Sequence, residues 1–438
     1  MRSHTAVAAL FGACLLAAVA GASAGAANAA GWGRPFRLTP PYTTDLTPVG
    51  VTVGRNAAAT AFSTRDQDHP AVSRAFLAIR AAGGSVSPPF AVPGAQEVLD
   101  LAYDRTGLRL LTAGSETGKT CCSTIQTLSQ LHNGRFGRAS RLTGNLTGLT
   151  IGTLTTLPSG RLLATIATDR GVWVAQSRPE DGFGPTRRLT SSGAMPWTVA
   201  TTADGRGQTM VAWTSTAGQQ GEVAPDQIVT ATGSEQSAPG RARTVVKAGK
   251  GHQIDEIGLG PGPRGATAGW TESWFDRRGA YHSNVLVSDM GAGSRPRTLS
   301  ATSGAAAGLE LAGDARGDQV VAWKSCARSG ACTAFAAVRP SGGRFGSAQG
   351  LGSIDPGQSP AATVASSGDA LVGWIASGHV YVAERRPGAG RLGAAKTVST
   401  TSYASGLALA FGASGTALAA WTQGTLAPDV VGAVFRGR

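Results

Sequence analysis

The stretch Gly317-Asp318-Gln319-Val320-Val321-Ala322-Trp323 is one copy of a motif that recurs along the chain. In each copy a turn leads into a short apolar strand, which ends in tryptophan in the clearest copies. The final positions of the eight copies, called the anchors below, are Phe62, Ala113, Ile166, Trp213, Trp270, Trp323, Trp374 and Trp421. They follow one another at intervals of about 50 residues, which indicates one structural unit per copy.

Each unit carries the signals of four short strands. An apolar stretch such as residues 197–200 is followed by a tight turn, often Asp-x-x-Gly as at residues 104–107, 204–207 and 314–317, and then by the anchor strand. A third strand follows a variable loop, and a fourth follows a glycine-rich turn. Hairpin-connected strands without helical periodicity predict an all-β protein, an eight-bladed β-propeller of four-stranded antiparallel blades. Seven blades are the alternative, if the units around Ala113 and Ile166 merge.

The two ends of the chain predict how the ring closes. After Trp421 there is enough sequence for a third strand, at residues 430–435, but not for a fourth. Residues 31–39 resemble the fourth-strand segments and end in Arg-Leu-Thr, as residues 188–190 do. We therefore predict that the N-terminal and C-terminal strands pair within the last blade. Such closure removes the open blade ends that a linear array would expose.

The N-terminal residues indicate export. Arg2 and His4 precede a run of apolar and small residues from 6 to 22, and the small-x-small sequence 27–29 follows as a cleavage signal. We interpret residues 1–29 as a signal peptide and residues 30–438 as a single propeller domain. No later stretch is apolar for long enough to cross a bilayer. We therefore expect a secreted, extracellular protein without a membrane span, and a monomer.

The formal net charge of +13 comes mainly from arginine. A nucleic-acid-binding protein is expected to cluster its basic residues and to interleave them with aromatic ones. Here the arginines recur singly at repeat positions, so we predict no nucleic-acid partner. Weak adsorption to anionic cell-wall polymers is the alternative that the charge leaves open.

The cysteines predict disulfides rather than a metal site. Cys326 and Cys332 bracket five residues in a loop between second and third strands, so a disulfide would staple that hairpin after export. Cys121 and Cys122 are adjacent in the equivalent loop of another unit, where a vicinal disulfide is slightly favoured over two free thiols. The nearest approach to a calcium loop, residues 66–68, is weak, and an Asp that caps its own turn explains Asp-x-x-Gly better. No metal and no cofactor are expected.

Candidate ligand-binding residues lie where the first strands of the units begin, because the first strands line a propeller channel. They are Glu97, Asp100, Trp197, His252, Asp255, Glu256, Glu310 and Tyr403. A second group is the loop 274–282, in which the rings of Trp274, Phe275, Tyr281 and His282 accompany two arginines. Trp274 and Tyr281 are its candidate ligand-binding residues. Rings beside cations suit carbohydrate or protein binding. Solvated channel residues, turn caps and packing within a blade are the alternative interpretations, and no residue is assigned a catalytic role.

The Gly-x-x-x-Val-x-Trp strands and the Arg-Pro-x-x-Gly-x-Phe-Gly turn of residues 339–346 resemble secreted β-propeller repeat proteins of actinobacteria, which are loosely similar to sialidase propellers. The first strands contain almost no arginine, and the chain has no Ser-x-Asp-x-Gly-x-Thr-Trp sequence. We therefore favour a non-catalytic binding or scaffold protein that recognises an extracellular glycan, peptide or protein. A glycan-cleaving hydrolase or lyase that uses carboxylates such as Asp255 and Glu256 is the alternative.

Overall fold

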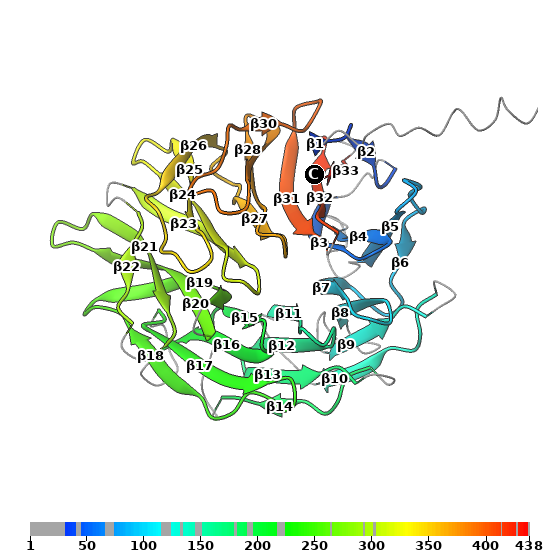
Figure 1. Ribbon diagram of the computed structural model, residues 1–438, viewed down its shortest axis with the longest axis horizontal. Helices are drawn as coiled ribbons and strands as arrows, with labels where there is room; N and C mark the ends of the chain where they lie inside the picture. Colours follow the sequence, from blue (N-terminus) through cyan, green and yellow to red (C-terminus); the bar gives the residue numbers. More distant parts are fainter. Residues whose placement is uncertain are drawn as a thin grey trace, which may run out of the picture.

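The computed structural model describes residues 31–40, 45–65, 74–114, 124–131, 135–144, 151–178, 182–190, 196–216, 224–262, 265–291, 294–300, 304–412, 414–425 and 428–436. Within these ranges the chain forms strands and turns but no helix. The strands make eight antiparallel sheets, arranged as the blades of a ring around a central opening (Figure 1). The predicted eight-bladed propeller is confirmed, and the seven-bladed alternative is wrong.

Each blade runs outward from the central channel, and its first three strands follow one another in the chain. The inner strands are β3 (Asp45–Val53), β7 (Glu97–Tyr103), β11 (Ile151–Thr156), β15 (Val199–Ala203), β19 (His252–Gly262), β23 (Ala305–Gly313), β27 (Ala361–Val364) and β31 (Ala404–Phe411). The second strands are β4 (Ala57–Arg65), β8 (Leu108–Gly114), β12 (Leu162–Thr168), β16 (Gln208–Ser215), β20 (Gly265–Phe275), β24 (Gln319–Cys326), β28 (Ala370–Ala376) and β32 (Thr416–Gln423). We number the blades 1 to 8 in this order.

The outer half of each blade is completed in the same way. The third strands are β5 (Arg74–Ala81), β9 (Thr124–Ser129), β13 (Gly171–Gln176), β17 (Gln227–Ser234), β21 (Tyr281–Asp289), β25 (Cys332–Arg339), β29 (His379–Arg385) and β33 (Asp429–Arg436). The outer strands of blades 1 to 7 are β6 (Phe90–Ala91), β10 (Ser140–Gly144), β14 (Arg187–Arg188), β18 (Arg243–Lys247), β22 (Arg297–Thr298), β26 (Gln349–Ile354) and β30 (Lys396–Thr397). Blade 8 instead uses β1 (Gly31–Trp32) and β2 (Phe36–Arg37).

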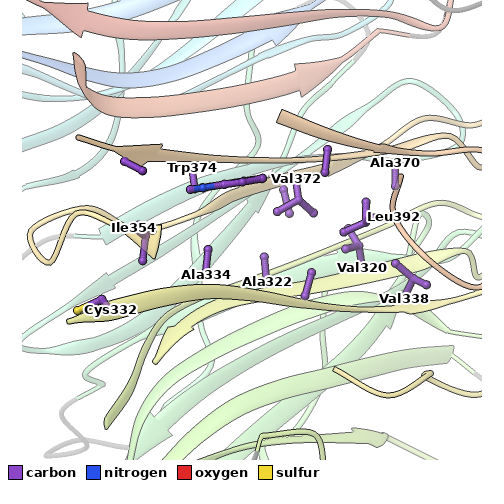
Figure 2. Packing of buried hydrophobic residues seen from close by; sticks show 14 residues of the cluster. Val320, Ala322, Cys332, Ala334, Val338, Ile354, Ala370, Val372, Trp374 and Leu392 are labelled. Atoms are coloured by element: carbon purple, nitrogen blue, oxygen red, sulfur yellow. The ribbon is translucent and has the colours of Figure 1, made fainter. Parts of the chain in front are cut away.

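The anchors pack each blade against the one before it. Figure 2 shows this for blades 6 and 7, where Trp374 and Val372 of β28 meet Val320, Ala322 and Ala334 of blade 6. The other tryptophan anchors lie in equivalent clusters and are fully or almost fully buried. Each burial of this kind stabilises the fold by roughly 1.5–3 kcal/mol.

Blade 2 departs from the predicted pattern by one residue. Leu108 and Leu110 of β8 pack toward blade 1, whereas Leu111 packs toward blade 3. Because side chains alternate along a strand, Thr112 and not Ala113 faces blade 1. Thr112 therefore occupies the anchor position there. The weak copy of the motif had no large side chain to mark the correct register.

The predicted closure of the ring is confirmed. In blade 8, Trp32 of β1 is opposite Phe435 of β33, and Phe36 of β2 is opposite Gly432. The rings of Trp32 and Phe435 lie 5.5 Å apart between centroids. Leu38, the first residue after β2, is buried among residues of blades 1 and 8. The two ends of the chain thus form one sheet, beside the label C in Figure 1.

The predicted Asp-x-x-Gly turns and one of the two predicted disulfides are confirmed. The carboxylates of Asp104, Asp204 and Asp314 accept backbone hydrogen bonds within their own Asp-x-x-Gly turns, as predicted. The disulfide between Cys326 and Cys332 joins the ends of β24 and β25. Residues 1–29, 66–68, 121 and 122 lie outside the described residues. The described part of the chain contains no helix long and apolar enough to span a membrane.

The closure predicts a measurable difference between two leucines. Leu38→Ala removes buried side-chain atoms at the seam between blades 8 and 1, so we expect the free energy of unfolding to fall by about 2–5 kcal/mol. Leu131→Ala is the matched control, because 47% of that residue is exposed, and a change within about 0.5 kcal/mol is expected. Urea unfolding of both variants checks this. Equal stability of the two variants would contradict the closure.

Candidate functional site

The predicted binding residues gather at one end of the ring. In each blade, the inner strand starts at the end where the second strand turns into the third, because successive strands are antiparallel. We call this end the front face and the opposite end the back face. Trp197 and Tyr403 precede inner strands, His252 begins one, and Trp274 and Tyr281 flank the β20–β21 turn. These five residues therefore belong to the front face.

Blade 5 builds a stack of three rings there. His252 of β19 is opposite Trp274 of β20, which is opposite His282 of β21, so the three side chains lie in one row on one face of the sheet. The Trp274 ring stacks on that of His252 at a centroid distance of 4.6 Å and on that of His282 at 5.5 Å. The sequence predicted Trp274 and His252 as binding residues and included His282 in the ring-bearing loop, but it did not predict that the three rings stack. The sequence does not show which residues of β20 and β21 are opposite each other, so it could not place His282 beside Trp274.

Two carboxylates fix the orientation of the imidazoles in this stack. Glu272 Oε1 lies 2.6 Å from Nδ1 of His252. Asp276 Oδ2 lies 3.1 Å from Nε2 of His282, and its Oδ1 accepts the backbone amides of Arg278 and Ala280. These hydrogen bonds, above all the one from Ala280, hold the pKa of Asp276 below its ordinary value. The stack is thus a rigid base beneath the turn.

Exposed aromatic side chains are concentrated on the same face. The exposed fractions are 45% for Trp197, 68% for Phe275, 40% for Tyr281 and 64% for Tyr403. Phe275 and Tyr281 contact each other edge to face at the tip of the β20–β21 hairpin, with 5.4 Å between centroids. Phe275 is one of the four rings that the sequence predicted in the loop 274–282, although it was not among the candidate ligand-binding residues. Because it neighbours Trp274 on a strand, it projects from the opposite side of the hairpin.

Two of the predicted carboxylates join neighbouring blades. Asp100 accepts the amide of Leu101 in its own blade and that of Leu154 in blade 3, both at 2.7 Å. Glu256 accepts the amides of Gly308 at 3.0 Å and Leu309 at 2.8 Å, both in blade 6. In both cases the carboxylate follows a β-bulge in the inner strand. Bulges redirect side chains, and here they aim a carboxylate at the next inner strand.

Gln358 performs the same task between blades 7 and 8. Its Oε1 accepts the amide of Gly406 at 3.0 Å. Gly406 and Gly308 both lie in bulges of the receiving strand and have positive φ values of 60° and 65°. A residue with a Cβ is strained in this conformation, so glycine suits both positions. At two blade junctions, therefore, a side chain of one blade accepts a hydrogen bond from a bulge in the inner strand of the next blade.

Glu310 is the channel carboxylate with the most perturbed titration. It follows the bulge of β23, and the residue is exposed to solvent on its inner strand. Desolvation, with a second contribution from the charge of Glu256, raises its pKa to about 7. Desolvation also raises the pKa of Asp100 to about 6, against the hydrogen bonds that it accepts. The pKa values of Glu97 and Asp255 are raised for the same first cause.

The ring separates the predicted residues into groups. Blade 5 and its neighbour blade 6 bring together His252, Asp255, Glu256, Trp274, Tyr281 and Glu310. Glu97 and Asp100 belong to blade 2, on the other side of the channel, while Trp197 precedes blade 4 and Tyr403 precedes blade 8 (Figure 1). Among the described residues, no three His, Cys, Asp or Glu side chains are grouped as metal ligands.

Comparisons with known proteins define the fold. No family model matches the sequence, and no curated protein matches it. Among solved structures, the Dos1 propeller is similar, with 10% identity over 92% of this chain and 94% of that one and a TM-score of 0.51. A microbial sialidase, Hz136, is 11% identical over 92% of this chain and 99% of that one, with a TM-score of 0.41. The polysaccharide lyase Uly1 is 9% identical over 89% of this chain and 90% of that one, with a TM-score of 0.47. The similarity to the Dos1 propeller agrees with the propeller fold of this chain.

The titration of Glu310 predicts a pH dependence of stability. With the pKa of this group raised from 4.5 to about 7 on folding, the folded state binds more protons than the unfolded state in this interval. The free energy of unfolding therefore falls as the pH rises through it. Glu310→Gln is expected to reduce that fall and to be more stable than the wild type at about pH 8. Urea unfolding at a series of pH values checks this, and identical slopes would contradict it.

The role of Glu256 can be tested by removing its acceptor atoms. Glu256→Ala leaves the amides of Gly308 and Leu309 without this partner, so we expect the free energy of unfolding to fall by about 1–3 kcal/mol. Glu256→Gln keeps one oxygen acceptor and should lose less. Chemical denaturation distinguishes these outcomes. A fully stable alanine variant would show that the bridge to blade 6 contributes nothing.

Proposed function

We propose that the protein is a secreted, non-catalytic binding protein that recognises an extracellular glycan or protein with the front face of its ring. The observation that carries this proposal is the gathering of exposed aromatic side chains on that face. Trp197, Phe275, Tyr281 and Tyr403 all belong to it, whereas Leu131, the remaining large exposed apolar residue of the described chain, belongs to the back face. Exposed aromatic residues are the usual energetic centres of recognition surfaces.

The tip of the β20–β21 hairpin is the centre of the proposed surface. Phe275 and Tyr281 provide two rings in contact, and the exposed Arg277 and Arg278 lie in the turn between them. The faces of such rings pack on the apolar C–H faces of sugars, and the guanidinium groups donate hydrogen bonds to sugar oxygens or to carboxylates. The ring stack beneath holds the tip in place, which reduces the entropy lost on binding.

The hydrogen bonds of the channel favour binding over catalysis. Asp100 and Glu256 each direct both carboxylate oxygens to backbone amides. A general base must have an oxygen within reach of the proton that it removes. These two residues are therefore assigned to the structure of the ring, and the aromatic tip is assigned to recognition. Export as a signal-peptide-bearing precursor, inferred from residues 1–29, places the ligand outside the cell in this proposal.

The test is a glycan and cell-wall array, probed at several salt concentrations with the wild type and two variants. Phe275→Ser/Tyr281→Ser removes the two aromatic rings at the tip of the β20–β21 hairpin. We expect this to weaken saturable, selective binding at least about tenfold. Leu131→Ser is the control for loss of an exposed apolar residue on the back face. Retained binding by the double variant, or unselective binding that disappears with salt, would reject the proposal.

Glycan cleavage is the second candidate function, and one observation favours it. Glu310, with a pKa of about 7, and Glu256 are close enough to interact electrostatically within the channel. Glycosidases pair a carboxylic acid with a second carboxylate. Glu310 would be the acid, and the second carboxylate would come from a residue other than Glu256, whose oxygens both accept backbone amides. Incubation with the array ligands, followed by mass spectrometry of the products, decides between the two functions. Cleavage that is lost in Glu310→Gln would establish the enzyme, and intact ligands would exclude it for those glycans.

A further inference from the structure

The back face contains a cavity that the proposed function does not use. Its volume is about 960 Å³, and its walls come from blades 4, 5 and 6. The Asp-x-x-Gly turns of blades 4 and 6 form two of the walls, and Gly262 and Gly265 of blade 5 also line the cavity. The two Asp-x-x-Gly turns join inner to second strands, so the cavity opens at the end of the ring opposite the aromatic tip.

Three arginines make the cavity strongly basic. Arg206 and Arg316 occupy the same place in their Asp-x-Arg-Gly turns, and Arg243 begins the outer strand of blade 4. All three residues are exposed, and none forms an ion pair with a carboxylate of the described chain. The acidic residue among the described lining is Asp204, whose Oδ1 accepts the amides of Arg206 and Gln208 at 2.9 Å. That carboxylate is engaged by its own turn.

The cavity continues into a groove along blades 4 and 5. A second hollow of about 440 Å³ shares Arg243 and Met290 with the cavity and adds Lys247. Its acidic residue, Asp289, is paired with Arg339 at 2.7 Å. Arg243 and Lys247 are the first and last residues of β18, so the cationic side chains continue from the cavity along the outer strand of blade 4. We call the two hollows together the back groove.

A contact between two turns forms the wall of the cavity on the channel side. A Cβ atom on Gly205 would lie 3.1 Å from that of Ala315, so the turns of blades 4 and 6 touch across blade 5. Both residues also border a hollow of about 500 Å³ that is lined by channel residues such as Leu259 and Leu311. The back groove is therefore a separate site from the channel carboxylates.

We propose that the back groove binds an anionic polysaccharide whose carboxylate or phosphate groups recur along the chain. Guanidinium groups bind both kinds of anion through paired hydrogen bonds. The exposed side chain of Gln208 in the lining can hydrogen-bond sugar hydroxyls. The described lining has no aromatic side chain on which a base could stack, which disfavours single-stranded nucleic acid.

Isothermal titration calorimetry with the full chain tests this site. The probes are an oligogalacturonate, which carries carboxylates, a poly(glycerol phosphate), and a neutral maltooligosaccharide as control. The test variant is Arg206→Gln/Arg243→Gln/Arg316→Gln. The matched control is Arg138→Gln/Arg344→Gln/Arg391→Gln, which removes the same net charge from exposed arginines outside the groove. Thermal unfolding verifies that both variants are folded.

The expected result is saturable binding of at least one anionic probe, which the groove variant weakens at least tenfold and the control variant less than twofold. The preferred probe then shows whether carboxylate or phosphate is the recognised group. No binding of either anionic probe, equal loss in both triple variants, or equal binding of the neutral probe would overturn the proposal. The Phe275→Ser/Tyr281→Ser variant should bind the anionic probe normally, so failure of this site and of the front-face proposal can be told apart.

Discussion

The burial of apolar sheet faces between neighbouring blades is the interaction on which this structure depends. Each blade has two apolar faces and is too small to bury either of them alone. An anchor such as Trp323 covers the face of the preceding blade, where it packs with Val285, Val287 and Leu299. Because every blade needs two neighbours, the repeat is stable only as a closed ring. The rigid ring then holds loops from distant parts of the sequence at two opposite faces.

The ring was predictable from the sequence because large side chains recur at one position of each unit. Tryptophans in five units fixed the number and register of those blades, and the fragment ending in Leu38-Thr39 revealed the closure. The weak unit of blade 2 shows the limit of this reasoning. Threonine at position 112 is too small to mark the anchor, so the sequence pattern predicted Ala113, the next residue, in its place.

The candidate site was predictable in its residues but not in their roles. The front-face position of His252, Trp274 and Tyr403 followed from strand order alone. The tasks of Asp100 and Glu256 depended on bulges in the inner strands, which shift each carboxylate toward an amide of the next blade. Bulges leave little trace in the alternation of a short strand, so these residues resembled free channel carboxylates. The sequence shows that Arg206 and Arg316 hold the same place in two repeats. It does not show that these two arginines and Arg243 line one cavity, because that depends on the arrangement of neighbouring blades.

The pairing of β1 and β2 with β33 has a consequence for the order of folding. Blades 1 to 7 are each built from contiguous residues, so they can form as the polypeptide emerges, whereas blade 8 needs its first-made and last-made strands together. That final step closes a loop of nearly the whole chain, and contacts of such long sequence separation form slowly. Until it occurs, the open edge of β33 is available to the β1 segment of another molecule. Concentrated refolding should therefore favour strand-exchanged dimers, in which each molecule completes the eighth blade of the other.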